Sequence, residues 1–184
     1  MFVRFYNFCE AEGVFHMSAQ VAVVMGSKSD LPSLKGAFET LQKFGVDFEA
    51  RVISAHRTPD QAAEFARGAE DRGIKVIICA AGMAAHLAGV IASFTVLPVI
   101  GIPMVSEPFS GMDALLAMVQ MPPGIPVSTV TAGPAGAKNA ALSAVAILAL
   151  NDPDLKLKLK EFRADQTRKV QEADSLLQKE LGLA

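Results

Sequence analysis

Two of the chain's three histidines stand in short segments of small and polar residues, a setting that suits acid and base chemistry. The segment at residues 54–59 reads SAHRTP, so a serine hydroxyl and a guanidinium lie near the imidazole of His56. Ser54 and Arg57 are residue types that bind phosphate oxygens, and imidazole exchanges protons near neutral pH. The segment predicts a site that holds a phosphorylated substrate beside a general acid and base, although an ordinary polar loop would also explain these residues.

Residues 26–30 read GSKSD and form a candidate anion site. Glycine allows a sharp turn, and Ser27 and Ser29 offer hydroxyl donors in front of the free amides of a following helix. Asp30 ends the segment and adds a carboxylate. In the simpler alternative, Ser29 or Asp30 only caps that helix.

A third segment, residues 80–87, reads AAGMAAHL. Small residues such as Gly82 let a substrate approach the backbone closely. His86 stands at the start of a predicted helix, whose dipole disfavours a protonated imidazole; the alternative is that His86 only caps or packs. No spacing of His, Cys, Asp or Glu in the sequence predicts a metal site.

Apolar runs of strand length alternate with segments of helical period, which indicates βαβ units and a parallel sheet. Residues 76–80 are continuously apolar and predict a central strand, whereas residues 48–52 alternate apolar and charged residues as an edge strand does. Ligands of such sheets bind outside the carboxyl ends of the strands, and each polar segment follows a strand. The predicted strands are residues 20–26, 47–53, 75–81, 98–102 and 127–130.

Three helices have clear signals in the sequence. Residues 31–44 repeat apolar side chains at helical spacing. Residues 58–61 read TPDQ, a predicted capping box that opens a second helix, and Gly73 is expected to end that helix. Leucines recurring after residue 153 predict a long C-terminal helix, with no strand to follow, that contacts a neighbouring subunit.

We expect the chain to have three parts: an N-terminal arm at residues 1–16, a catalytic α/β domain at 17–152 and the C-terminal helix at 153–184. The arm interleaves aromatic and charged residues without the apolar run of a signal peptide. Because it precedes Met17 and the first strand, we interpret it as disordered or as an over-extended start.

Composition limits the classes of partner. Hydrophobic residues make up 51% of the chain against 20% charged, and the mean hydropathy is +0.34. No apolar run reaches the length of about 18 residues that a membrane span needs, so we expect no membrane partner. The excess of apolar side chains instead predicts a homo-oligomer that buries them between subunits. A net charge of −2, no tryptophan and one tyrosine argue against nucleic acid. Cys9 and Cys79 fit free thiols in the reducing cytoplasm.

Four segments in register, at residues 26–30, 54–59, 84–87 and 119–127, resemble the N5-carboxyaminoimidazole ribonucleotide mutase family of purine (IMP) biosynthesis. The likeness runs from about residue 20 to residue 150. It implies a flavodoxin-like three-layer αβα sandwich, a five-stranded parallel sheet and a cytoplasmic homo-octamer. It also implies an isomerase that moves a carboxylate from the exocyclic nitrogen of a small ribonucleotide to ring carbon 4, through released and recaptured carbon dioxide, with neither metal nor cofactor.

The resemblance also implies roles for individual residues. His56 would be the general acid and base, and His86 would line the pocket near the migrating carboxylate. Ser54 and Arg57 would bind the phosphate. The residues expected to bind the substrate as a whole are Ser27, Ser29, Asp30, Ser54, Arg57 and Gly82.

Three residues depart from the family pattern: Met83 and Ser128 stand where glycine is usual, and Ala88 where proline is usual. Two other classes remain open. A related subfamily carboxylates the aminoimidazole ribonucleotide directly with carbon dioxide, but it typically carries lysine at the position of Arg57 and lacks the AAHL run. A non-enzymatic flavodoxin-like nucleotide-binding module fits less well, because the chain beyond residue 16 has no Trp or Tyr to stack on a flavin.

Overall fold

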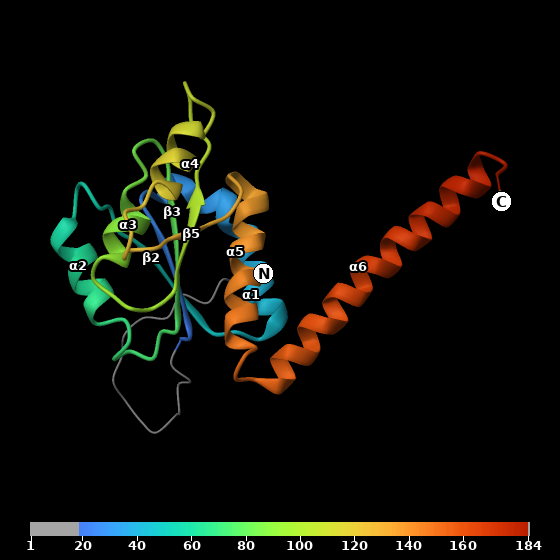
Figure 1. The fold of residues 1–184 in the computed structure, drawn as a ribbon, viewed down its shortest axis with the longest axis horizontal. Coiled ribbons are helices and arrows are strands. Elements are labelled where there is room, and N and C mark those ends of the chain that lie inside the picture. Colours follow the sequence, from blue (N-terminus) through green and yellow to red (C-terminus); the bar gives the residue numbers. More distant parts are fainter. Residues whose placement is uncertain (1–18, 184) are drawn as a thin grey trace.

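The computed structural model describes residues 19–183, and within them a parallel sheet has the strand order β2-β1-β3-β4-β5 (Figure 1). All four pairings between neighbouring strands are parallel, which confirms the predicted sheet. The predicted arm at 1–16 lies outside the described residues. The strands are β1 Val21–Met25, β2 Phe48–Val52, β3 Val76–Ala81, β4 Val99–Pro103 and β5 Ser128–Thr129.

The exposure of the strands follows their place in the sheet. Every residue of β3 is buried at the centre, whereas β2 is exposed along half of its length at the edge. Both positions were predicted from the apolar run and from the alternation of charged residues. In the register, Met25 of β1 pairs with Val52 on one side and with Ala80 on the other. The carboxyl ends of β1, β2 and β3 therefore lie side by side at the same edge of the sheet.

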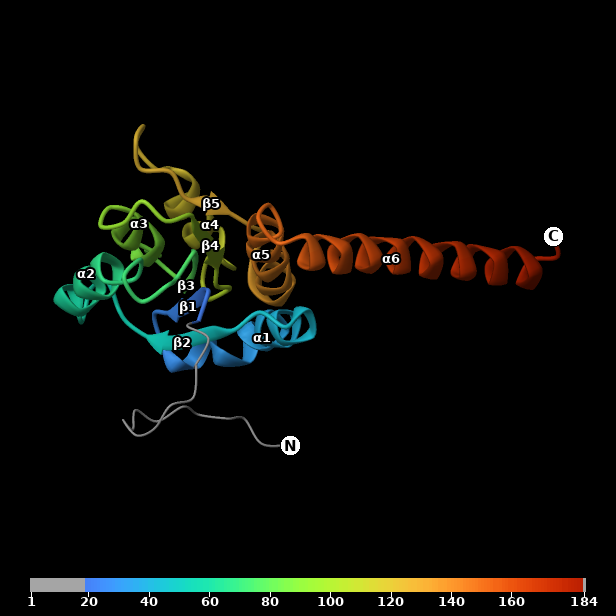
Figure 2. The same ribbon diagram turned by 90° about the horizontal axis from the view of Figure 1, so that it is seen from below.

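Helices cover both faces of the sheet, as Figures 1 and 2 show. On one face α1 and α5 bury a core with residues of β1, β3 and β4. On the other face α2, α3 and α4 bury a second core, which makes the three-layer sandwich of a flavodoxin-like fold. The helices are η1 Lys28–Asp30, α1 Leu31–Phe44, α2 Pro59–Arg67, α3 Leu87–Ala92, α4 Met112–Val119, α5 Gly133–Leu148 and α6 Pro153–Glu180.

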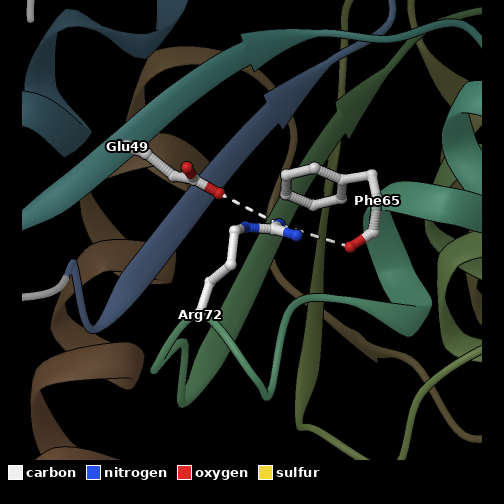
Figure 3. A network of polar contacts seen from close by, with 3 residues as sticks. All are labelled: Glu49, Phe65 and Arg72. Carbon is white, nitrogen blue, oxygen red and sulfur yellow. Dashed lines mark hydrogen bonds and ion pairs between the residues drawn. The ribbon is translucent and has the colours of Figure 1, made fainter. Parts of the chain in front are cut away.

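Helix α2 ends earlier than the sequence predicts, at Arg67 instead of just before Gly73. The cause is Arg72, whose guanidinium donates to the Phe65 carbonyl at 3.3 Å and so occupies a group that a longer helix would use (Figure 3). The same guanidinium lies 4.7 Å from the centre of the Phe65 ring and 3.4 Å from a carboxylate oxygen of Glu49. Residues 68–73 form turns instead.

Helix α6 begins where Asp152 accepts a hydrogen bond from the Leu155 amide at 2.9 Å, and the predicted long C-terminal helix is confirmed. Leu155 is buried, and Leu159 and Phe162 pack against the core of the first face. Beyond Phe162 the helix projects away from the sheet (Figure 2). None of the helices in the described part of the chain is long and apolar enough to cross a membrane.

Two helical glycines, Gly136 of α5 and Gly36 of α1, are predicted to respond to alanine substitution in opposite directions. A Cβ at Gly136 would overlap the Thr131 carbonyl oxygen, so we expect Gly136→Ala to lower the free energy of unfolding by more than about 3 kcal/mol. At Gly36 the nearest atoms to a Cβ are 3.9 Å away. Gly36→Ala should therefore raise the free energy of unfolding by about 0.5 to 1 kcal/mol, because alanine has the higher helix propensity. Urea denaturation of both variants measures the difference, and equal effects would contradict it.

Candidate active site

The three polar segments meet at the carboxyl edge of the sheet because their backbones are joined there. The Gly26 amide, after β1, donates to the Ala80 carbonyl of β3 at 3.0 Å. The Ile53 amide, after β2, donates to the Met25 carbonyl at 3.0 Å. The loops after β1, β2 and β3 thus form one continuous surface, although they are distant in the sequence.

The turn after β1 is held by its own side chains. The Ser27 hydroxyl accepts from the Ser29 amide at 3.2 Å and from the Ser29 hydroxyl at 2.7 Å. In return an Asp30 carboxylate oxygen accepts from the Ser27 amide at 3.1 Å, which completes a capping box. This box caps the short turn η1 and not helix α1, whose N-cap residue Asp30 makes no capping hydrogen bond, so the predicted alternative of a cap on that helix is wrong. The proton of the Ser27 hydroxyl remains available to a ligand.

Asp30 is half-buried, and this burial raises the pKa of its carboxyl above the ordinary value of 3.8, while the hydrogen bond from Ser27 lowers it by less. A carboxylate that has lost part of its hydration is stabilised by further donors. Hydroxyl groups of a sugar are donors of this kind. Asp30 is thus suited to accept hydrogen bonds from a ribose.

The turn after β2 is built around Ser54. Its hydroxyl accepts from the Arg57 amide at 3.2 Å and from the Arg57 Nε at 3.3 Å, so both bonds leave its own proton free to donate. Arg57 also donates through Nη2 to the Gly26 carbonyl at 2.9 Å, which ties this turn to the one after β1. The remaining N–H groups of the exposed guanidinium face solvent and can bind an anion.

Thr58 occupies the predicted N-cap position of α2, but the predicted capping hydrogen bond is wrong. Its hydroxyl instead accepts from the Ser54 amide at 3.0 Å and donates to the Ser54 carbonyl at 3.1 Å. The hydroxyl has turned back toward β2, where the Ser54 backbone offers it both a donor and an acceptor. Thr58 therefore shapes the loop that presents Ser54, a role that its capping signature did not suggest.

The two histidines are in direct contact. Nε2 of His56 lies 2.8 Å from Nδ1 of His86, and the ring centres are 4.9 Å apart with the rings at 76°. Only one proton fits between these two nitrogens, so one ring donates and the other accepts. The pair can give up a proton and take it back while each ring holds the other in orientation.

The turn that presents His86 has an unusual backbone. The Ala85 amide donates to the Gly82 carbonyl at 3.0 Å, and His86 then occupies the N-cap of α3. Met83 and Ala85 both have positive φ angles, 56° and 43°. The left-handed conformation explains why glycine suits position 83, which this chain fills with a methionine that is 65% exposed.

The site is open to solvent in the single chain. His56, Arg57 and His86 are exposed, and so are Met83 and Ala84 of the loop before His86. Within residues 19–183, no group of three or more His, Cys, Asp and Glu side chains is placed to hold a metal ion. Cys79 is buried in the core below the site, where desolvation raises the pKa of its thiol.

Comparisons with known proteins agree on one family. The family model described as AIR carboxylase matches residues 20–169. N5-carboxyaminoimidazole ribonucleotide mutase from Pyrococcus abyssi is 56% identical over 81% of this chain and 84% of its own length. The enzyme of that name from Brucella melitensis is 53% identical over 86% of this chain and 98% of its own. The crystal structure of Treponema denticola PurE matches with a TM-score of 0.77 and 31% identity, covering 85% of this chain and 97% of that one.

The left-handed turn before His86 generates a prediction about stability. Met83→Gly removes the Cβ that disfavours a φ of 56°, so we expect the free energy of unfolding to rise by about 0.5 to 1 kcal/mol. Met83→Ala keeps the Cβ and is the matched control, because little packing is lost from an exposed side chain. Thermal melts should place the glycine variant about 1 to 4 °C above the alanine variant. Equal melting temperatures would show that the turn is not strained.

Proposed function

This chain belongs to the AIR carboxylase family, and from that premise we propose that it converts N5-carboxyaminoimidazole ribonucleotide to 4-carboxy-5-aminoimidazole ribonucleotide in purine biosynthesis. The observation that carries the proposal is the pair of hydrogen-bonded imidazoles beside a group of anion-binding side chains. The relatives that match at 53% and 56% identity over most of the chain are named for this mutase.

The substrate's phosphate is bound by Ser54 and Arg57, whose free hydroxyl proton and free N–H groups point away from the hydrogen bonds that hold the turn. The ribose lies toward Ser27 and Asp30, with Ser29 beside them, where the carboxylate accepts from sugar hydroxyls. An anchor at this end leaves the imidazole ring of the nucleotide to extend toward His56 and His86. Such positioning is what an acid-base step within about 3 Å requires.

The reaction needs one proton donated and one removed. The bond between the exocyclic nitrogen and the carboxylate carbon breaks, its electron pair stays on nitrogen, and His56 gives that nitrogen a proton while carbon dioxide is released. Ring carbon 4 then attacks carbon dioxide and becomes tetrahedral, and His56 takes the proton that this carbon must lose. The product is an isomer of the substrate, and the pair of histidines returns to its starting protonation state.

General acid-base help of this kind is typically worth about 100- to 10,000-fold in rate. His86 contributes in the proposal by holding His56 Nε2 in a fixed direction at 2.8 Å and by lining the pocket near the migrating carboxylate. Gly82, four residues before it, leaves room for the substrate to approach the backbone. No cofactor takes part in any step of the proposal.

Direct carboxylation of aminoimidazole ribonucleotide by carbon dioxide is the second candidate, because the matching family model is described as AIR carboxylase. Arg57 and the AAHL run at residues 84–87 favour the mutase, as do the names of the most similar relatives given above. A non-enzymatic binding module would not need two imidazoles in contact at the ligand edge of the sheet.

A cytoplasmic homo-octamer is also part of the proposal. Carbon dioxide that leaves the nitrogen must stay near the ring, yet the site of one chain is open. A second subunit would supply the missing wall. Support comes from apolar side chains that the single chain leaves in solvent, such as Val96 at 89%, Leu150 at 77% and Val170 of α6 at 71% exposure.

The proposed reaction is tested by following both carboxylated ribonucleotides by absorbance and by NMR. We expect the purified protein to interconvert them without ATP, metal or added bicarbonate, because the carboxylate carbon comes from the substrate itself. Carbon-13 in the substrate carboxylate should remain in the product when unlabelled bicarbonate is present. Conversion of aminoimidazole ribonucleotide and bicarbonate alone, with loss of the label, would instead identify the direct carboxylase.

His56→Asn tests the assignment of the acid and base. Asparagine keeps a polar side chain of similar size but cannot exchange the proton, so turnover should fall by at least about 100-fold. Affinity for the ribonucleotide, measured by calorimetry, should change little because Ser54 and Arg57 are unaltered. A variant with near-normal turnover would show that His56 is not the proton-transfer group.

A further inference from the structure

A buried hydroxyl near the site has no partner in the structure. Among residues 19–183, the Oγ of Ser106 is enclosed by protein and makes no hydrogen bond. Removing a hydroxyl from water without a compensating hydrogen bond destabilises a protein, so buried hydroxyls of folded proteins are nearly always paired. An exception next to a ligand site indicates a group whose partner comes with the ligand.

The position of Ser106 follows from the register of β3 and β4. Ala81 pairs with Pro103 at the ends of these strands, and the Met104 amide donates to the Ala81 carbonyl at 2.8 Å. The chain then passes beside Gly82, so that Ser106 Oγ is 3.7 Å from where a Cβ of Gly82 would be. Ser106 therefore lies at the carboxyl edge of the sheet, against the residue that begins the loop of His86.

Gly82 connects this hydroxyl to the histidines. The Gly82 carbonyl accepts the Ala85 amide in the turn that ends at His86, and His86 contacts His56. Because Gly82 has no side chain, the Ser106 hydroxyl lies against the start of the loop that ends at His86. A substrate held by its phosphate would bring its reacting end to this region.

We propose that the Ser106 hydroxyl donates a hydrogen bond to an oxygen of the migrating carboxyl group and retains the carbon dioxide formed from it between nitrogen and carbon 4. This inference rests on the proposed mutase function and adds a binding site for the one part of the substrate that changes position. The hydroxyl rotates about one bond, so a single donor can follow the oxygen from the carbamate to the carbon-bound carboxylate.

Two other buried oxygens in the described part of the chain also lack partners, Asp113 Oδ1 and Thr129 Oγ1. A carboxylate oxygen has no proton to donate to an anion, which removes Asp113 as a ligand for the carboxyl group. Thr129 pairs in the sheet with Gly101, two residues before the end of β4, and so lies below the level of Gly82. Of these three groups, Ser106 is the one that has a proton to donate and also lies beside Gly82, at the carboxyl edge of the sheet.

The test is Ser106→Ala, with Ser93→Ala as the matched control. Ser93 is exposed after α3, and its hydroxyl is already satisfied by the Val90 carbonyl at 2.7 Å. In the ligand-free protein, removing an unpaired buried hydroxyl should leave the melting temperature unchanged or raise it by a few degrees. The increase in melting temperature caused by 4-carboxy-5-aminoimidazole ribonucleotide should be smaller in Ser106→Ala than in the wild type. Both quantities should stay near wild type in Ser93→Ala.

Catalysis gives the second readout. Loss of one hydrogen bond to a charged group predicts a fall in turnover of about 10- to 100-fold for Ser106→Ala. A larger share of the substrate should end as free aminoimidazole ribonucleotide, because carbon dioxide escapes before recapture. Affinity for aminoimidazole ribonucleotide, which has the phosphate and no carboxylate, should be unchanged.

Ser106→Cys, which keeps a similar volume but donates weakly, should resemble the alanine variant and replaces it if Ser106→Ala fails to fold. Normal turnover with no extra release of aminoimidazole ribonucleotide in the variants would overturn the inference, as would an equal loss of affinity for that ligand. A wild-type protein that does not interconvert the two carboxylated ribonucleotides would overturn the proposed function instead.

Discussion

The parallel pairing of β1 with β2 on one side and β3 on the other is the constraint on which the site depends. This pairing sets Met25, Val52 and Ala80 side by side, so that the next residues of all three strands emerge at one edge. Hydrogen bonds from Gly26 and Ile53 continue the pairing beyond the strands themselves. A shift of one residue in either pairing would reverse which face each side chain meets and would separate His56 from His86.

The local hydrogen bonds that fold the loops also leave hydroxyl protons free for the phosphate that we propose they bind. Ser54 accepts two bonds from Arg57, and Ser27 accepts two from Ser29, which uses their oxygens and leaves their protons. Because the loops are ordered by their own side chains before any ligand binds, little conformational entropy is lost on binding. The guanidinium of Arg57 favours a negatively charged group, and the half-buried carboxylate of Asp30 favours hydrogen-bond donors, so the two ends of the proposed site differ in the group that they would bind.

Much of this arrangement could be predicted from the sequence, because strand and loop signals are local. The apolar run of β3, the alternation in β2 and the polar segments after each strand located the sheet and the edge at which these segments meet. The parts that could not be predicted depend on contacts between distant residues. Arg72 ends α2 early by taking the Phe65 carbonyl, and Thr58 binds the Ser54 backbone instead of capping its own helix. The 2.8 Å contact between His56 and His86 likewise joins residues 30 positions apart, and no single segment carries a signal for it.

Helix α6 has a consequence for how this chain can change over generations. Its 28 residues extend about 40 Å at about 1.5 Å per residue, and among residues 19–183 only its first turns, through Phe162, pack against the core. Substitutions in its outer half therefore escape the selection that folding of the sandwich imposes. In the homo-oligomer that we propose, mutations there would be restrained by the neighbouring subunit that the helix contacts, and not by the proposed active site.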